Sequence, residues 1–182
     1  MPRRTEYRLN LNVFASRTSE LIQIQLQDDF VSLDLFRTDD IVIKQLLGEE
    51  AIPVDYAGVA WCIYCQPEVA FAGMSEQAAI DAGYQVVTKK HRWGGNSRAQ
   101  IIGELDGVVK VIAEKQADGT AGRVLGVHMA GPWVTEQLGQ AYLAVNWQAT
   151  VDEIAHFIQP HPSLSENFGE AVLALTGRSL NG

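Results

Sequence analysis

Apolar and polar residues alternate with a period of two along much of the chain up to about residue 130, which is typical of half-buried β-strands. The alternating runs are rich in branched and aromatic residues, and turn-forming residues separate them. Asp118-Gly119, between the last two runs, is a strong hairpin signal. We therefore expect strands at residues 58–65, 68–72, 84–90, 107–114 and 123–129.

Two stretches between these strands carry other signals. Residues 75–83 predict a helix, because a serine stands at the N-cap position and Gly83 at the end. Residues 94–98, Gly-Gly-Asn-Ser-Arg, predict a turn, and residues 101–103 predict a further extended piece. The glycine-rich loop has neither the G-x-G-x-x-G spacing nor the lysine that a phosphate-binding loop needs.

The period becomes helical at Pro132, a residue that is tolerated in the first turn of a helix. The apolar stripe of this helix contains Val134, Leu138, Ala141, Tyr142 and Val145. A second helix is expected from Thr150, which opens a capping box, to about Ile158. A third should follow residue 163 and end at Gly177. Hairpin-linked strands followed by helices predict an α+β fold, an antiparallel sheet with helices packed on it.

Three segments are expected along the chain. Residues 1–40 are an atypical N-terminal segment, in which the alternation over residues 22–35 predicts a β-hairpin with one apolar face. Such a hairpin needs further structure to pack on. Residues 41–57 are expected to form a connector, with a short helix up to Gly48 and a linker, and residues 58–182 the main domain.

Composition and charge narrow the classes of partner. A formal net charge of −8 and a pI of about 4.9 argue against nucleic acid or an anionic membrane surface as the main partner, because neither attracts an acidic protein. No uninterrupted apolar run approaches the length needed to cross a bilayer, and the Met-Pro-Arg-Arg start is not followed by an apolar signal core. We therefore expect a cytoplasmic protein.

Two cysteines, Cys62 and Cys65, form a C-x-x-C pair. That spacing occurs in thioredoxin-like redox sites and in zinc sites. Here it lies in a predicted strand, where residues three apart point to opposite faces, so the sulfurs are expected to diverge. The sequence offers no second pair to complete a zinc site. We expect buried, unreactive thiols, with a redox or metal pair as the alternative.

The remaining histidines and the tryptophans are expected to be structural. His128 should lie on the face of its strand opposite the apolar residues Leu125, Val127 and Met129. His91 and His156 are expected either at the surface or with hydrogen-bond partners in the core. Packing is the expected role of the four tryptophans, Trp61, Trp93, Trp133 and Trp147.

Near the C-terminus, one histidine stands between two prolines in Gln159-Pro160-His161-Pro162. Proline fixes its own φ and disfavours the helical region for the residue before it, so the imidazole is expected on a rigid, extended segment. The His161-Pro162 bond is also a candidate cis peptide. Glu166 follows in an S-x-x-E capping box. Its carboxylate either only caps the helix backbone or also orients His161, which would make the two residues an acid-base dyad.

The stretch His161-Pro162-Ser163-Leu164-Ser165-Glu166 resembles the His-Pro-Thr-Leu-Ser-Glu motif of dihydrolipoamide dehydrogenases, which are flavin-dependent pyridine nucleotide-disulfide oxidoreductases. Residues 66–73, 107–112 and 123–132 agree with the same family in order and spacing. The similarity covers residues 41–182 and is to the C-terminal interface domain of these enzymes. Leu164 favours dihydrolipoamide dehydrogenase over the glutathione and mercuric reductases.

The resemblance implies the interface-domain fold, a homodimer, and FAD and NAD as cofactors of the whole enzyme. It implies that His161 acts as general base and acid in the active site of the partner subunit, where a dithiol substrate loses a proton, and that Glu166 orients the imidazole. The implied partners are the flavin- and NAD-binding domains of the same enzyme and a 2-oxo acid dehydrogenase complex.

The sequence lacks the parts that carry electrons in that family. It contains no nucleotide-binding glycine loop and no C-x-x-x-x-C disulfide motif. Residues 5–15 faintly resemble the end of the family's flavin domain, but Ser16-Arg17-Thr18 stands where a flavin-contacting Gly-Asp would follow. We therefore expect this chain alone to bind no cofactor and to transfer no hydride. The alternatives are a non-catalytic homodimerisation module and the same domain of a glutathione or mercuric reductase-like protein.

Overall fold

The computed structural model describes residues 42–50 and 55–179, and the structural findings below concern these ranges. A short helix at residues 42–47 lies inside the predicted connector, and Gly48 after it has a φ of 72°. A left-handed glycine is a common helix end. The hairpin predicted within residues 1–40 lies outside the described residues. The compact unit that carries the sheet begins at Asp55.

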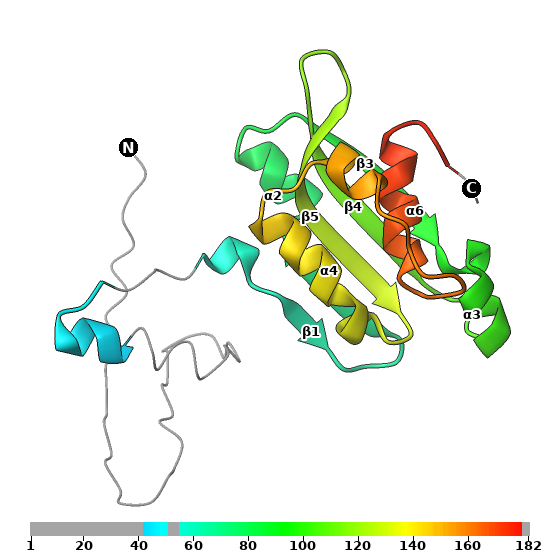
Figure 1. The fold of residues 1–182 in the computed structure, drawn as a ribbon, viewed down its shortest axis with the longest axis horizontal. Coiled ribbons are helices and arrows are strands. Elements are labelled where there is room, and N and C mark those ends of the chain that lie inside the picture. Colours follow the sequence, from blue (N-terminus) through cyan, green and yellow to red (C-terminus); the bar gives the residue numbers. More distant parts are fainter. Residues whose placement is uncertain (1–41, 51–54, 180–182) are drawn as a thin grey trace, which may run out of the picture. The chain divides into compact units, whose positions relative to one another are not determined.

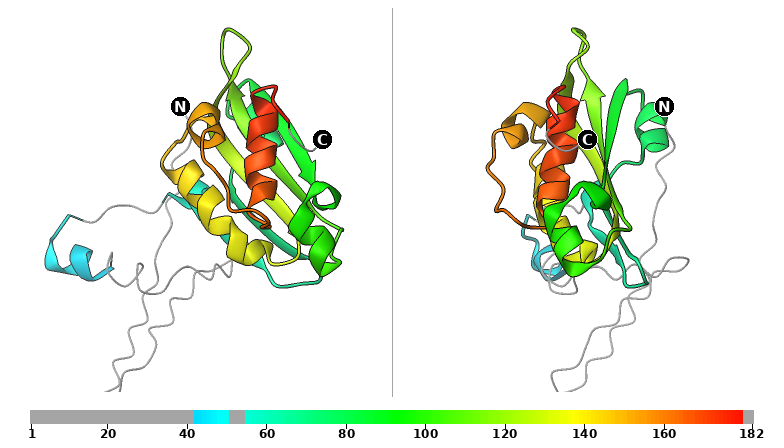
Figure 2. Two further views of the ribbon diagram at one scale, coloured as in Figure 1. Left: turned by 45° about the vertical axis from the view of Figure 1, so that its right-hand side comes forward. Right: turned by 90° about the vertical axis from the view of Figure 1, so that its right-hand side faces the viewer.

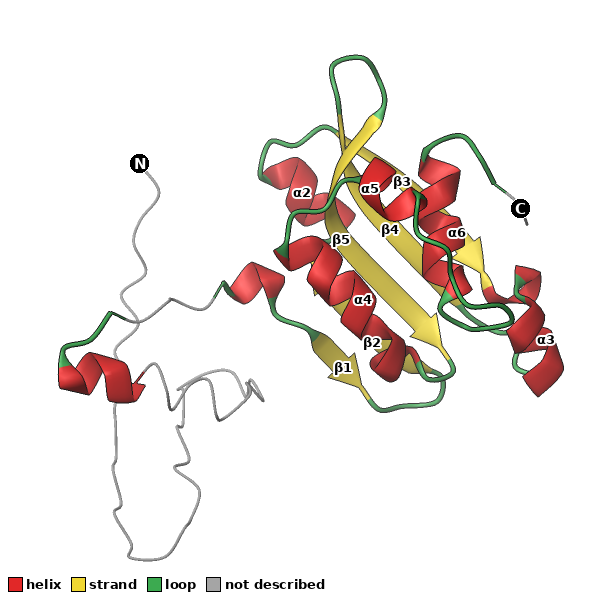
Figure 3. Cartoon of the chain, in the orientation of Figure 1, coloured by secondary structure: helices red, strands yellow, loops and turns green. Residues whose placement is uncertain are grey.

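Five antiparallel strands form one sheet in the spatial order β1-β2-β5-β4-β3 (Figure 1). The strands are β1 (Trp61–Ile63), β2 (Glu68–Gly73), β3 (Val86–Arg92), β4 (Val108–Lys115) and β5 (Ala121–Gly131). β4 and β5 form the hairpin that Asp118-Gly119 predicted, with a left-handed φ of 88° at Gly119. The separation of helices and strands into layers (Figure 3) confirms the α+β fold.

Three helices cover one face of the sheet, and a fourth lies on the opposite face, as the edge-on view of Figure 2 shows. The covering helices are α4 (Val134–Asn146), α5 (Val151–Ala155) and α6 (Glu166–Leu175), and the fourth is α2 (Glu76–Asp81). The remaining short elements are η1 (Tyr56–Gly58), η2 (Trp93–Gly95) and α3 (Ser97–Ile102). None of the helices in the described ranges has the length and hydrophobicity that a transmembrane span requires.

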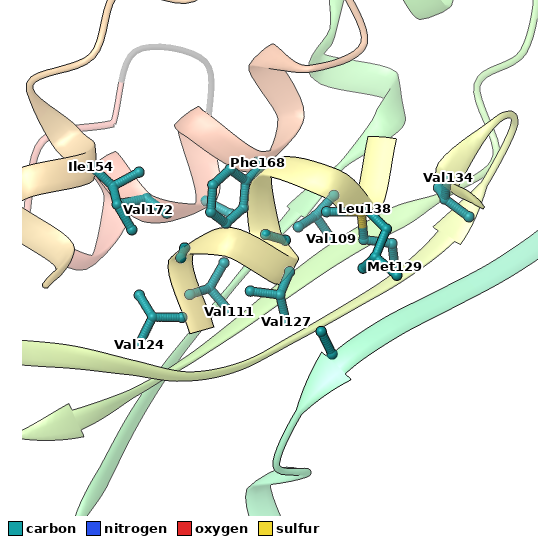
Figure 4. Packing of buried hydrophobic residues seen from close by; sticks show 14 of the residues in the cluster. Val109, Val111, Val124, Val127, Met129, Val134, Leu138, Ile154, Phe168 and Val172 are labelled. Atoms are coloured by element: carbon teal, nitrogen blue, oxygen red, sulfur yellow. The ribbon is translucent and has the colours of Figure 1, made fainter. Parts of the chain in front are cut away.

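The main core lies between the sheet and its covering helices (Figure 4). Val111 and Val127 of the sheet are fully buried there. Leu138 of α4 and Phe168 of α6 close the core from the helix side, each with 2% of its surface exposed. The strand period of two and the helical period therefore point their apolar residues at a common layer. Burial of each such side chain contributes roughly 1.5–3 kcal/mol.

Two predicted helix starts are confirmed by their caps. Ser75 Oγ accepts a hydrogen bond from the Ala78 N–H at 3.1 Å at the start of α2. At the start of α5, Thr150 Oγ1 accepts from the Glu153 N–H at 3.3 Å, while Glu153 Oε2 accepts from the Thr150 N–H at 2.8 Å. The reciprocal pair satisfies two backbone donors that the helix itself leaves free.

One helix, α3, was not predicted. The sequence indicated a turn at residues 94–98 and an extended piece at residues 101–103 in its place. Asn96 is the N-cap, and its Oδ1 accepts from the Ala99 N–H at 2.9 Å. Gly103 ends the helix with a φ of 76°. Asparagine before a helix and glycine after it are the usual boundary residues, so the signal was present in the sequence.

A β-bulge in β5 moves one apolar residue to the other face of the sheet. Gly126 pairs with Ile112, but the next pair on β5 is made by Val124, so Leu125 is an extra residue. Leu125 is buried with Ile112 in a small cluster beside α2, whereas Val127 belongs to the main core. The simple alternation that placed Leu125 on the same face as Val127 was therefore wrong.

Candidate functional site

We call the segment between α5 and α6, residues 156–165, the histidine arm. The second predicted helix extended to Ile158, but α5 ends at Ala155. Phe157 and Ile158 therefore lie in the arm, with 68% and 98% of their surface exposed. The His161-Pro162 peptide bond is cis, as the sequence suggested.

Two buried asparagines hold the second half of the arm. Asn96, the cap of α3, also donates a hydrogen bond from Nδ2 to the Ser163 carbonyl at 2.8 Å. Asn167 of α6 donates from Nδ2 to the Leu164 carbonyl at 3.0 Å. The two side chains are 4% and 0% exposed, so these bonds are shielded from competing water. The arm is therefore fixed from two different helices just beyond the histidine.

The imidazole and the carboxylate of the predicted dyad are in contact. His161 Nδ1 lies 2.9 Å from Glu166 Oε1, and Glu166 Oε2 accepts a hydrogen bond from the Ser163 N–H at 2.8 Å. The Glu166 side chain is 22% exposed and the His161 side chain 67%. One carboxylate oxygen thus contacts the backbone N–H of Ser163 and the other contacts the imidazole ring.

The capping box predicted around Glu166 is only half formed. α6 begins at Glu166, and its N-cap residue Ser165 makes no side-chain capping bond. The Ser163 hydroxyl is buried and has no hydrogen-bond partner. Only the bond from the Ser163 N–H to the carboxylate is made. Glu166 therefore organises the turn before the helix, and no serine hydroxyl shares that role.

The geometry defines what the imidazole can do chemically. An ionised carboxylate only accepts hydrogen bonds, so a neutral His161 ring contacting Glu166 carries its proton on Nδ1. Nε2 is then left with a lone pair that can accept a proton from a group outside the domain. Such a ring is suited to general acid-base catalysis.

The two cysteines diverge, but only one is even partly buried. Cys62 packs against the main core, and burial, together with the carboxylates of Glu136 and Glu68, raises the pKa of its thiol. Cys65 lies beyond the end of β1, is exposed, and has its Sγ 3.0 Å from the Pro67 carbonyl oxygen. The expectation of two buried thiols was therefore wrong for Cys65. Both thiols are free, and the described residues contain no group of three or more potential metal ligands.

Two other histidines occupy different faces of the sheet. His128 lies on the face away from the main core, where it stacks on Phe71 with ring centroids 5.4 Å apart and has Nε2 3.0 Å from the Met74 carbonyl. His91 of β3 is 7% exposed, and its Nε2 has no hydrogen-bond partner. Burial lowers the pKa of His91, and the Glu170 carboxylate partly opposes this effect. His91 is therefore a buried ring with one unsatisfied nitrogen, not the satisfied histidine that was expected.

The tryptophans are not all packing residues. Trp93 is fully buried, and a Cβ at Gly107 or Gly131 would lie only 2.8 or 3.0 Å from its ring, which explains why both neighbours are glycine. The other three are exposed by 39%, 53% and 76% at Trp61, Trp133 and Trp147. The predicted packing role is thus seen for Trp93 and for Trp61, which stacks on Phe71 with ring centroids 6.1 Å apart, whereas more than half of the surface of Trp133 and Trp147 is exposed.

A family model described as the pyridine nucleotide-disulphide oxidoreductase dimerisation domain matches residues 59–172. The chain belongs to this family. The matched range begins before β1 and ends inside α6, so it contains the whole sheet and the histidine arm. The family resemblance seen in the sequence is confirmed, and with it the type of fold.

Curated relatives place the domain more narrowly. The chain is 38% identical over 144 residues to the mitochondrial dihydrolipoyl dehydrogenase of Canis lupus familiaris, and 38% identical over 141 residues to the dihydrolipoyl dehydrogenase of Bacillus subtilis. These matches cover 79% and 78% of this chain but only 28% and 29% of the relatives. The chain thus spans less than a third of their length and contains the dimerisation domain of a dihydrolipoyl dehydrogenase-like flavoprotein disulfide reductase.

Solved structures agree with this assignment. LpdA from Mycobacterium tuberculosis superposes with a TM-score of 0.65 at 26% identity, over 74% of this chain and 28% of that one. The HOCl-induced flavoprotein disulfide reductase RclA from Escherichia coli gives a TM-score of 0.65 at 24% identity, over 78% of this chain and 31% of its own, and shares the fold.

The described residues do not fit a flavin or nicotinamide dinucleotide. Such cofactors bind at a glycine-rich turn between a parallel strand and a helix. Every strand pair of the described sheet is antiparallel, and the chain contains no G-x-G-x-x-G turn. The described residues therefore contain no dinucleotide-binding turn of this type.

Proposed function

We propose that this chain supplies the dyad of His161 and Glu166 to the active site of a partner subunit in a dihydrolipoyl dehydrogenase-like enzyme. The observation that carries the proposal is the 2.9 Å contact between His161 Nδ1 and Glu166 Oε1 on an exposed, anchored arm. With 67% of its side chain exposed, the imidazole can meet a group that belongs to another subunit.

In this proposal, His161 Nε2 takes the proton of a dithiol substrate, because only the thiolate is a competent nucleophile. The thiolate attacks a disulfide held by the neighbouring subunit and forms a mixed disulfide, and one sulfur of that subunit leaves as a thiolate. The second substrate thiol then resolves the mixed disulfide. The substrate ends as a disulfide and the neighbour as a dithiol, while Glu166 keeps the ring oriented throughout.

The partner in this proposal is a second copy of the same polypeptide, and the flavin- and NAD-binding parts belong to the whole enzyme. A surface for a second copy is available on the covering helices. Leu143 and Trp147 of the α4 region have 42% and 76% of their surface exposed, and Ile158 of the arm has 98%. Exposed side chains of this size are typical of protein interfaces. Membership of a 2-oxo acid dehydrogenase complex stays a prediction.

The test supplies the full chain in trans to a dihydrolipoyl dehydrogenase from which the dimerisation domain has been removed. We expect the chain to restore NAD reduction with dihydrolipoamide. His161→Ala should lower the restored rate by about 10²- to 10⁴-fold, the usual contribution of a general base. Glu166→Gln should lower it by about tenfold or more, because the ring loses its orienting partner.

His156→Ala is the matched control, because this histidine is also exposed but lies at the other end of the arm, with Nδ1 2.6 Å from the Asp152 carbonyl. It should restore the rate as well as the unchanged chain does. Equal rescue by the His161→Ala chain and the unchanged chain would contradict the dyad.

A non-catalytic homodimerisation module is the second candidate, and the exposed apolar surface of α4 favours it equally. It predicts a stable dimer by sedimentation velocity that is indifferent to His161→Ala and Glu166→Gln. The two candidates separate in the turnover assay, because only the first predicts that these substitutions remove activity from an intact dimer.

A further inference from the structure

Trp133, the residue before α4, has an unusual backbone. Its φ of 55° and ψ of 28° are left-handed, and within the described residues it shares a positive φ with one other non-glycine, Gln148. Gln148 follows the end of α4, where a left-handed residue is ordinary. Trp133 stands at the N-cap, where extended backbone is usual, and it makes no side-chain capping bond. Its conformation thus has no explanation in helix capping.

The surroundings hold Trp133 in this conformation and keep its indole outside the core. Gln137 Nε2 lies 3.0 Å from both the Pro132 carbonyl and the Trp133 carbonyl, to which it donates. The next residue, Val134, is fully buried, whereas Trp133 is 53% exposed. A strained left-handed residue that its neighbours hold in place is more often found at functional sites than elsewhere.

The indole lines a depression that reaches the histidine arm. The depression has a volume of about 380 Å³ and lies between α3, the start of α4 and the arm. Its walls are Arg98, Trp133, Glu136, Gln137 and residues 162–165. Pro162, in this wall, is bonded directly to His161. The larger hollows of about 560 and 830 Å³, beside β3 and on the open face of the sheet, contain no residue of the arm.

The lining suits an elongated molecule that is apolar along its length. The indole of Trp133 and the ring of Pro162 offer hydrocarbon surface, and Arg98 and Glu136 add charges of opposite sign to the lining. Because Pro162 is bonded to His161, an aliphatic chain that lies against the two rings would run beside the segment that carries the imidazole. A small polar dithiol has no chain to place there.

We propose that Trp133 is a specificity-determining residue that contacts the aliphatic chain of the dithiol substrate. This inference rests on the proposed function of His161. It adds that Trp133 is the residue whose contact with a hydrocarbon tail makes a tailed dithiol bind more tightly than a compact, polar dithiol.

The test compares Trp133→Gly with the unchanged chain in the reconstituted enzyme. Glycine adopts a φ of 55° without strain, so the fold should be kept while the indole is lost. The KM for dihydrolipoamide should rise about tenfold with little change in kcat. The rate with dithiothreitol, a compact, polar dithiol that has no hydrocarbon tail, should not change. Tyr64→Ser removes another exposed aromatic ring, which does not line the depression. It should change neither the KM for dihydrolipoamide nor the rate with dithiothreitol.

Several results would overturn the inference. An unchanged KM for dihydrolipoamide, an equal loss with both dithiols, or dissociation of the dimer by Trp133→Gly would each do so. Loss of activity in His161→Ala together with an unchanged KM in Trp133→Gly would reject this inference alone. A full rate in His161→Ala would reject the proposed function, whatever Trp133 does.

A second measurement needs no turnover. The indole N–H signals of the full chain can be followed by NMR during titration with lipoamide, with the Trp133 signal assigned from Trp133→Gly. The Trp133 signal should shift before those of Trp61 and Trp147, which are also exposed. Equal shifts of the three exposed signals, or no shift of Trp133, would reject the contact.

Discussion

Two stretches of the chain carry reactive side chains beside a cis proline bond, and they differ in what they bring together. In the histidine arm, His161 and Glu166 are five residues apart in the chain, and His161 Nδ1 lies 2.9 Å from Glu166 Oε1. In the stretch ending at the Gln66-Pro67 bond, Cys62 and Cys65 are three residues apart, yet one packs on the core and the other is exposed. Distance along the chain therefore does not decide which groups can react together.

The difference comes from how each backbone is held. A strand sends residues three apart to opposite faces, and Cys62 lies in β1. The arm instead turns back at Ser163, where Glu166 accepts the backbone N–H, and Asn96 fixes the same residue from α3. A turn that is closed by side-chain hydrogen bonds brings its first and last residues together, and an extended strand cannot. The predictions below test this contrast, from the largest expected effect to the smallest.

Removal of the Asn96 anchor should have the largest effect on stability. Asn96→Ala removes both the cap of α3 and the bond to the Ser163 carbonyl, and we expect a loss of about 2–3 kcal/mol in urea unfolding. Asn96→Ser can still cap α3 but cannot reach the arm, and it should recover about 1 kcal/mol. Identical stabilities for Asn96→Ser and the unchanged chain would show that the arm contact contributes nothing.

The alkylation rates of Cys65 and Cys62 should differ by a factor of about ten or more, with Cys65 the faster. Cys65 is exposed, whereas burial and two carboxylates raise the pKa of Cys62 and so lower its thiolate fraction. Limiting iodoacetamide followed by peptide mass spectrometry measures both rates in the same sample. Similar rates in the folded chain would mean that the strand does not protect Cys62.

The buried His91 should make the free energy of unfolding depend on pH. Burial lowers the pKa of His91 from its usual 6.5, so the folded state binds fewer protons than the unfolded state below that pH. The contribution of His91 is therefore complete above about pH 6.5 and falls as the pH decreases below it, by at most about 1.4 kcal/mol per pH unit.

Urea unfolding at pH 7.5 and 5.5 measures this dependence. His91→Phe keeps a ring of similar shape without a titrating group, so its loss of stability between the two pH values should be smaller. His156→Phe, at an exposed site, should retain the loss of the unchanged chain. The same loss in His91→Phe as in the unchanged chain would contradict the assignment.

The smallest effect is expected at Ser163. Its hydroxyl is buried without a partner, so Ser163→Ala should change the free energy of unfolding by only a few tenths of a kcal/mol, in either direction. Ser75→Ala provides the contrast, because Ser75 caps α2, and it should cost about 1 kcal/mol. A cost at Ser163 as large as that at Ser75 would mean that its hydroxyl has a role in the arm.

Local sequence signals predicted an element well where residues close together in the chain form its turn or its cap. The hairpin at Gly119 and the caps at Ser75 and Thr150 are examples, because the turn or cap is made by residues within four positions. The α3 helix was not predicted, although Asn96 and Gly103 mark its ends, because Gly94 and Gly95 directly before it are also a strong local signal for a turn. The bulge at Leu125 could not have been foreseen, since it depends on register against β4.

The sequence by itself determined the α+β fold and the family, and it gave the pairing of one imidazole with one nearby acid as a hypothesis. These features depend on periodicity, helix caps and motifs, which are all formed by residues close together in the chain. Only the tertiary structure decided that Asn96 anchors the arm from 67 residues away, that Cys65 is exposed, and that Trp133 lines a depression beside the arm. These features depend on contacts between segments that are distant in the chain. No local propensity encodes such contacts, because their partners are selected by packing.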